Sequence, residues 1–142
     1  MKRFTLAVLV VAILAVPGVS LAKGPKTPKG TCTPHNVRFR VAGTVVSGSL
    51  TAGTGKHTYS GTLVVQVTKA SKAAKAAKGT QQTYTLTDTR LRLHGEDPAA
   101  LTANSRVRLE GRMTALGKKC DQTGFTATVT IRRGSIKPPT PA

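Results

Sequence analysis

The sequence predicts an all-β protein, a small closed barrel of five strands, and three observations carry this prediction. The chain has 142 residues, which is the size of one small domain. Its middle, residues 35–133, is rich in Thr and Val, whose branched side chains favour extended backbone. Five runs in this middle alternate apolar and polar residues with a period of two, as strands with one buried face do.

The first run alternates apolar residues with arginines and is interrupted by a glycine. In Val37-Arg-Phe-Arg-Val41 the apolar side chains point to one face and the two arginines to the other. Gly43 follows before Val45 and Val46, and glycine is common at the bulges of curved sheets. We therefore expect a first strand that bends at Gly43.

Four further runs follow, and the third has a possible break at Thr87-Asp-Thr89. Each predicts a strand, because polar residues occupy the alternate positions. The expected inward positions are Leu63, Val65 and Val67 in residues 59–68; Tyr84, Leu86, Leu91 and Leu93 in 80–93; Val107, Leu109 and Met113 in 106–113; and Phe125, Ala127, Val129 and Ile131 in 125–132.

One short helix is expected between the third and fourth strands. Asp97 is a suitable N-cap, Pro98 suits the first helical position, and Ala-Ala-Leu101 follow. Five strands with one short helix at this place is the order of an OB-type barrel, whose closure hides the strand edges. The predicted fold class is therefore an all-β, five-stranded OB-like barrel. A plain β-sandwich is the alternative.

Three segments resemble small exported bacterial OB-like β-barrel domains of unknown function. Val41-Ala-Gly-Thr-Val-Val46 is similar to their glycine-bent first strand, and Phe125–Arg132 to their closing strand. Leu101–Arg112 resembles their turn-and-strand pattern L-x-x-(G/N)-x-x-V-x-(V/L)-x-G, with Asn104-Ser105 where glycine is usual. The chain also departs from these domains by a basic insertion at 69–78. The resemblance implies a fold and an exported location, and it implies no activity.

Residues 1–22 have the features of a signal peptide. Two basic residues precede the apolar stretch 6–16, and Ser20-Leu-Ala22 places small residues at a cleavage site. The apolar stretch is shorter than the roughly 20 residues of a membrane-spanning helix, although an uncleaved anchor is the alternative. We expect a secreted, extracytoplasmic protein with no membrane span after signal removal. A basic Pro/Gly-rich leader (23–34), the barrel (35–133) and a C-terminal tail (134–142) would follow.

The charge of the chain is strongly positive. Lys and Arg number 22 against five Asp and Glu, so the formal net charge is +17. Removing residues 1–22 takes away Lys2 and Arg3 and leaves 17 − 2 = +15. Such an excess attracts polyanions from a distance.

Two cysteines, Cys32 and Cys120, permit one intramolecular disulfide in an oxidising compartment. The bridge would tie the segment before the first strand to the segment before the last. A redox-active or metal-binding pair is the alternative, but the spacing is not that of a CxxC motif and no His adjoins either cysteine.

The segment 69–78 is the low-complexity part of the chain. Lysine recurs at every third position with Ala and one Ser between. Spread around a helix these lysines leave no apolar stripe for docking, so we expect a mobile, solvated loop between the second and third strands. It would either contact a polyanion electrostatically or act only as a solubilising loop. The lysines are Lys69, Lys72, Lys75 and Lys78.

Arginines repeat at every second position of the third and fourth strands. They would form one outward cationic patch if these two strands were neighbours, and the guanidinium fork suits phosphate and carboxylate. Ordinary polar surface is the alternative. With Phe39 and Phe125 expected in the core, two tyrosines remain for base stacking, which argues against sequence-specific nucleic-acid binding. The arginines are Arg90, Arg92, Arg106, Arg108 and Arg112.

Motifs for catalysis are absent from the sequence. His35, His57 and His94 lie in no HxH or HExxH spacing, and there is no GxSxG elbow. We therefore expect no enzyme, no cofactor and no metal site. The expected function is a secreted binding module for anionic polymers, either envelope polyanions or nucleic acid bound non-specifically. Alternatives are a structural or accessory module of the cell envelope that docks on a protein partner, and a small hydrolase.

Overall fold

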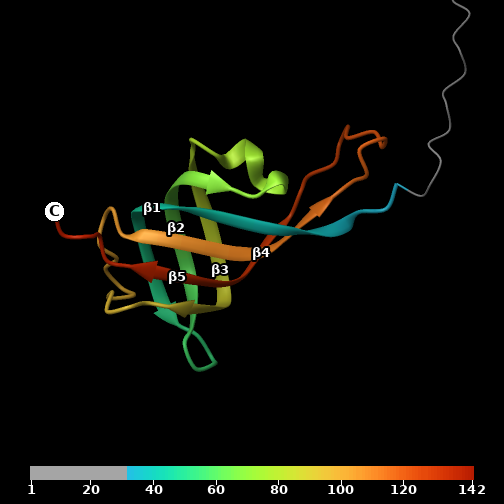
Figure 1. Ribbon diagram of the computed structural model, residues 1–142. Helices are drawn as coiled ribbons and strands as arrows, with labels where there is room; N and C mark the ends of the chain where they lie inside the picture. The colour runs from blue at the N-terminus through green and yellow to red at the C-terminus, as the bar shows by residue number, and fades with distance from the viewer. Residues whose placement is uncertain (1–31) are drawn as a thin grey trace, which may run out of the picture.

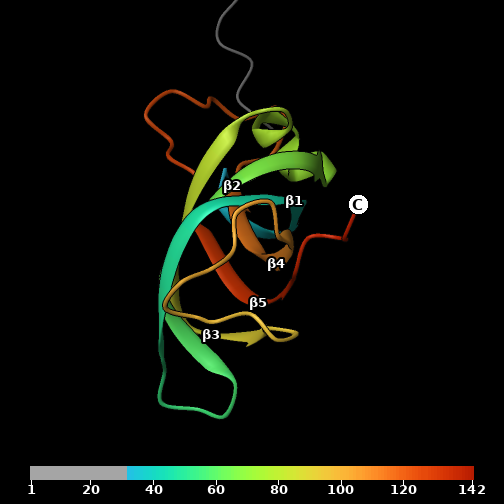
Figure 2. The ribbon, with the colours of Figure 1, turned by 90° about the vertical axis from the view of Figure 1, so that its left-hand side faces the viewer.

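The computed structural model describes residues 32–142 and shows a closed, all-β barrel. Around the barrel the strands follow the order β1-β2-β3-β5-β4, and β4 closes on β1 (Figures 1 and 2). The OB-like barrel is thus confirmed, and the β-sandwich is wrong. The predicted signal peptide 1–22 and residues 23–31 of the leader lie outside the described residues. The elements are β1 (His35–Ala52), β2 (Thr58–Ala70), the 3₁₀ helix η1 (Lys72–Ala77), β3 (Gln81–Arg92), β4 (Arg106–Ala115) and β5 (Val129–Lys137).

Strand β1 is long enough to serve two neighbours. It pairs with β4 from His35 to Thr44 and with β2 from Val41 to Ala52, both antiparallel. Register shifts at Ala42/Gly43 and Val45/Ser47 bend the strand between these two pairings. A Cβ at Gly43 would overlap the carbonyl oxygen of Gln66, so the close approach of β2 requires glycine. The bend predicted at Gly43 is confirmed.

The predicted inward faces of the first four strands form the core. Leu63, Val65, Val67 and Leu109 are fully buried, and the ring of Phe39 packs edge-on against that of Tyr84. Burying a side chain of this size stabilises the fold by about 1.5–3 kcal/mol. The remaining core members are Val41, Val45, Leu50, Ala74, Leu86, Leu91, Val107, Ile131 and Ile136.

The fifth strand lies later in the chain than predicted. Residues 125–128 are outside it, although Thr128 still bonds to the end of β4: its carbonyl accepts from the Thr114 N–H (3.0 Å), and its N–H donates to the Thr114 hydroxyl (2.8 Å). The strand continues to Lys137, so the prediction of a tail from residue 134 is wrong. A bulge opposite Glu110/Gly111 lets Ile131 and Ile136 both point inward although they are five residues apart.

The helix predicted at 97–101 is wrong, and a turn stands in its place. Oδ1 of Asp97 accepts a hydrogen bond from the Ala99 N–H (2.9 Å), but no helix continues. The segment instead follows β1, because the Leu50 N–H donates to the Pro98 carbonyl and the Val45 N–H to the Ser105 carbonyl, both at 2.8 Å. This segment therefore covers the part of β1 that β4 does not reach.

Glu96 anchors this segment from inside. Its carboxylate is buried, accepts a hydrogen bond from the fully buried Ser105 hydroxyl and accepts another from the Thr102 N–H (3.1 Å). The bond from Ser105 holds the pKa of Glu96 below its ordinary value; burial opposes this shift and the contacts with Thr102 support it. The ionised carboxylate therefore stabilises the folded state.

We expect the Glu96→Gln variant to be less stable at pH 7 by about 1–3 kcal/mol, because a charged acceptor of one buried and one partly buried hydrogen bond is lost. A lowered folded-state pKa contributes stability that is complete above the unfolded value near 4.5 and is lost as the pH falls through the folded value. Urea unfolding at pH 7 and pH 3.5 should therefore show a smaller acid-induced loss in the variant than in the wild type. Parallel losses would contradict this role.

The segment 69–78 is ordered and docked, so the expectation of a mobile loop is wrong. Lys69 and Ala70 end β2, and η1 follows. A 3₁₀ helix has three residues per turn, so side chains three apart share a face. Ala74 is buried and Ala77 packs against the core, whereas the lysines at 72, 75 and 78 are exposed on another face. A lysine at every third position leaves no apolar face on an α-helix, but on this 3₁₀ helix it leaves an apolar face of alanines toward the core.

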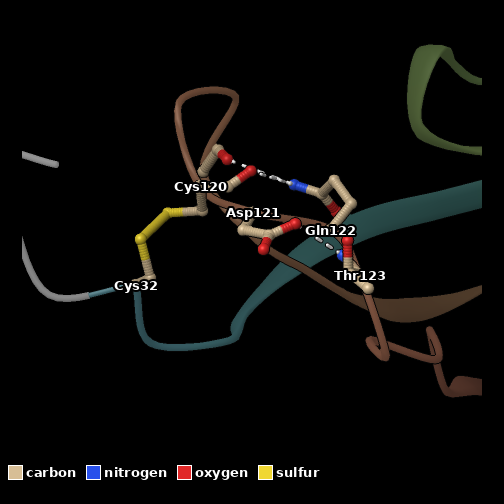
Figure 3. The surroundings of a disulfide bond; sticks show 6 residues. Cys32, Cys120, Asp121, Gln122 and Thr123 are labelled. Atoms are coloured by element: carbon tan, nitrogen blue, oxygen red, sulfur yellow. Dashed lines mark hydrogen bonds between the residues drawn. A yellow bond between two sulfur atoms is a disulfide. The ribbon is translucent and has the colours of Figure 1, made fainter. Parts of the chain in front are cut away.

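The disulfide Cys32–Cys120 is confirmed, with the two Cα atoms 5.6 Å apart. It joins the residue just before β1 to the loop between β4 and β5 (Figure 3). In that loop Gln122 donates to the carbonyls of Gly117 and Cys120, both at 3.3 Å, and Asp121 accepts from the Thr123 N–H. A disulfide of this kind fits an extracytoplasmic protein.

Within residues 32–142, no helix has the length and apolar character needed to cross a membrane.

Candidate functional site

Arginines from four strands share the outer surface of one side of the barrel. Strands β3 and β4 are not neighbours, contrary to the condition set for the predicted patch, because β5 lies between them. The patch forms nevertheless, since β5 contributes three cations of its own, Arg132, Arg133 and Lys137. Figure 1 shows β1, β4 and β5 side by side, and β3 borders β5 in parallel register.

The strand register arranges these side chains in rows across the sheet. One row runs Arg40, Glu110, Arg133 and Arg90 through β1, β4, β5 and β3. Residues opposite each other point to the same face, and neighbouring strands lie about 4.8 Å apart. The next row consists of Ala42, Arg108, Ser135 and Arg92. Beyond it lies a row of Thr44, Arg106 and Lys137. On the opposite side of the first row lies a row of Arg38, Arg112 and Thr130.

Three shallow concavities of about 550, 390 and 530 Å³ follow one another over these rows. The first two share Glu110 and Arg133, and the last two share Arg108 and Ser135, so the surface is continuous. We call it the basic face. Ten cations line it: Arg38, Lys69, Arg90, Arg92, Arg106, Arg108, Arg112, Arg132, Arg133 and Lys137.

The structure thus brings together all five arginines predicted as anion-binding, and it adds Lys69 from the predicted lysines. Sequence reasoning missed Arg38, Arg132, Arg133 and Lys137 as members of the site. Arg38 was recognisable as outward from its alternation with Val37 and Phe39, but its pairing with β4 was not. Arg132 and Arg133 are both exposed because the bulge in β5 places two consecutive residues outward.

The other predicted lysines lie elsewhere. Lys72 lines a different, apolar groove, and Lys75 and Lys78 line none of the four concavities described. The exposed row of η1 is therefore a second positive surface at the end of the barrel, separate from the basic face.

Glu110 is the one carboxylate among the described residues that line the basic face. Its Oε1 lies 2.9 Å from Nε of Arg40, and its Oε2 lies 2.8 Å from an Nη of Arg133. The hydrogen bond from Arg133 and the charges of Arg40, Arg133 and Arg38 lower the pKa of Glu110 against the effect of burial. This carboxylate compensates part of the charge of two arginines and leaves the others unpaired.

The remaining acids stabilise turns and loops and do not neutralise cations. Asp88 accepts from the N–H and hydroxyl of Thr54, Asp97 from the Ala99 N–H, and Asp121 from the Thr123 N–H. Within residues 32–142, the ion pairs are those of Glu110. The excess positive charge is therefore displayed outward.

Aromatic side chains do not contribute a stacking surface in the described part of the chain. Phe39 and Tyr84 are buried, and Tyr59 and Phe125 are half-buried. Phe39 was rightly predicted as core. Tyr84 belongs to the core as well and offers no stacking surface, whereas Phe125 is only half-buried. Without exposed aromatic rings the basic face cannot stack bases.

The basic face also differs in place from the face that OB-folds commonly use for oligonucleotides and oligosaccharides, over strands 2 and 3. Exposed positions in the middle of these strands include the neutral Thr62, Thr83 and Thr85, and charged exposed residues occur only toward the ends of β2 and β3. The cations instead lie over the first half of β1, over β4 and β5, and at the ends of β2 and β3.

Titratable clusters suited to metal binding are absent among residues 32–142. His35 begins β1, His57 lies in the β1–β2 turn with φ 58°, and His94 follows β3.

Comparison of the chain with protein-family models, with curated proteins and with solved structures finds no match.

Proposed function

We propose that the protein is a secreted, non-catalytic module that binds anionic polymers through the basic face. The observation that supports this most strongly is the gathering of ten cations with one carboxylate on a continuous, concave surface. The strands fix the backbone positions of these cations before a ligand arrives, so only their side chains have to be ordered on binding. Export through the predicted signal peptide, and kinship with small exported bacterial OB-like domains, belong to the same proposal.

A polymer fits this surface better than a single small anion. The rows cross four strands, and the pairs Arg90/Arg92 in β3 and Arg106/Arg108 in β4 are two residues apart, which is about 6.6–6.8 Å along a strand. A chain of phosphates, sulfates or carboxylates can contact several rows at once and release one counterion at each contact. Without base-stacking rings, binding to nucleic acid would read the backbone and not the sequence.

Salt dependence tests the proposal directly. We expect the full chain to bind heparin and a mixed-sequence DNA duplex, with an affinity for the duplex that falls at least about a hundredfold between 50 and 200 mM salt. A duplex of permuted sequence should bind equally. Failure to bind either polymer in dilute buffer would rule the proposal out and favour a module that docks on a protein.

The Glu110→Gln variant should bind polyanions more tightly than the wild type. It removes the negative charge of the face and frees Arg40 and Arg133 from their ion pairs. One added net charge at the contact steepens the salt slope by about 0.9 and raises affinity by up to roughly eightfold at 0.1 M salt. Fluorescence anisotropy of a labelled duplex measures this change, and a weaker affinity would show that Glu110 is needed to order the arginines.

A further inference from the structure

An apolar groove of about 680 Å³ opens at one end of the barrel, between the start of β1, the end of β4, η1 and the loop after β4. Its origin lies in the pairing of β1. This strand pairs with β2 only from Val41 onward, yet it pairs with β4 as far back as His35. The residues before Val41 therefore have the start of η1, and not a strand, along their other edge.

Ser71 fixes that edge. Its N–H donates to the Arg40 carbonyl (2.8 Å), and its hydroxyl accepts from the Arg40 N–H (3.2 Å), which continues the ladder by one residue. The inward positions Val37 and Met113, which are paired across β1 and β4, then lie beyond the closed core with η1 standing over one side.

The floor of the groove is apolar and recessed. Its side chains are half-buried, so none stands out from the surface as an anchor for insertion into a bilayer would. A concave apolar site of this size with a few polar groups at its edge is the usual form of a small-molecule site. The floor consists of Val37, Ala73, Met113, Ala115 and Leu116.

The rim of the groove carries one sign of charge. Among the described residues that line it there is no Asp or Glu, and within residues 32–142 no ion pair involves Lys72 or Lys118. A cationic rim above an apolar floor complements a ligand with an anionic head and an apolar chain. The rim consists of His35, Arg38, Arg40, Lys72 and Lys118.

We infer that this groove binds a free, single-chain anionic amphiphile, such as a fatty-acid carboxylate, with the alkyl chain on the floor and the head at the rim. The site is distinct from the basic face and shares only Val37 and Arg38 with it. It therefore does not depend on the polyanion proposal.

Calorimetric titration of the full chain with dodecanoate, kept below its micellar concentration, tests the inference. We expect saturable 1:1 binding that weakens about fourfold for each methylene removed between dodecanoate and hexanoate. Dodecyltrimethylammonium, which has the same chain and the opposite head charge, should bind at least tenfold more weakly. No binding of dodecanoate, or equal binding of the ammonium, would overturn the inference.

Two pairs of lysine substitutions separate the groove from overall charge. Lys72→Glu with Lys118→Glu reverses the rim, and Lys56→Glu with Lys119→Glu makes the same change of net charge at exposed positions outside the groove. We expect at least a tenfold loss for the first pair and less than a twofold loss for the second. Equal losses would reduce the effect to net charge and overturn the site.

Three further experiments test where the alkyl chain lies and whether the ligand is free or part of a membrane. Leu116→Asp puts a charge on the floor from a loop and should abolish binding, and melting curves of this variant and of the lysine pairs show whether each is folded. The triple variant Arg90→Gln, Arg92→Gln, Arg108→Gln should bind dodecanoate as the wild type does. Binding seen only when dodecanoate is embedded in phosphatidylcholine vesicles would indicate a membrane surface in place of a free amphiphile.

Discussion

The triple variant Arg90→Gln, Arg92→Gln, Arg108→Gln is expected to lose affinity for a DNA duplex by roughly 10²–10³-fold at 0.1 M salt. The three arginines line the central concavity of the basic face, where β3 and β4 approach across β5. Each phosphate contact contributes about 0.9 to the slope of log affinity against log salt, so the slope should fall by two to three. Anisotropy titrations between 50 and 200 mM salt measure both quantities.

The matched control for this variant is Lys72→Gln, Lys75→Gln, Lys78→Gln on the exposed row of η1, which removes the same three charges. Its expected loss is severalfold, because the row adds attraction at a distance without belonging to the face. Substitutions at exposed positions of this kind should leave the melting temperature of each variant within a few degrees of the wild type. Equal losses in both variants would mean that net charge alone governs binding.

The second large effect concerns the disulfide. The bridge Cys32–Cys120 closes a loop of 88 residues, and the chain-entropy model gives about 4–5 kcal/mol of stabilisation for that length. We therefore expect the Cys32→Ser, Cys120→Ser variant to melt on the order of 15 °C below the wild type. Both cysteines lie outside the strands, so the far-UV circular dichroism of the folded variant should match that of the wild type.

Reduction provides the control for this effect. Adding a reductant should lower the melting temperature of the wild type to that of the double variant and should leave the double variant unchanged. Coincident melting of the oxidised wild type and the double variant would show that unfolding of the barrel does not involve the bridge.

The strand pattern could be predicted where one face of a strand is buried along its whole length. In β2 and β4 the alternation of Leu63, Val65 and Val67, and of Val107 and Leu109, places each residue correctly. The same rule failed in β5, because a bulge changes the period by one residue and because the strand begins at Val129 and not at Phe125. Bulges and partner lengths depend on neighbours that are distant in the chain.

The candidate site was predictable in its composition but not in its extent. Alternation identifies Arg106, Arg108 and Arg112 as outward, whereas the parallel pairing that inserts β5 between β3 and β4 leaves no local trace in the sequence. The prediction of a mobile loop at residues 69–78 was wrong for a different reason. On an α-helix a spacing of three spreads the lysines around the axis, whereas on the 3₁₀ helix it keeps them on one face and lets Ala74 reach the core on another.

The geometry of η1 also limits how the segment can vary in length. The Val67 N–H donates to the Thr80 carbonyl, and the Val67 carbonyl accepts from the Gly79 N–H. Both ends of the segment 68–78 are therefore fixed at the same place in the β2–β3 hairpin. Adding or deleting three residues preserves the phase of the short helix, whereas deleting one residue or adding two before Ala74 would bring a lysine into the place that Ala74 occupies. Natural or engineered length variants of this excursion should therefore be tolerated in whole turns.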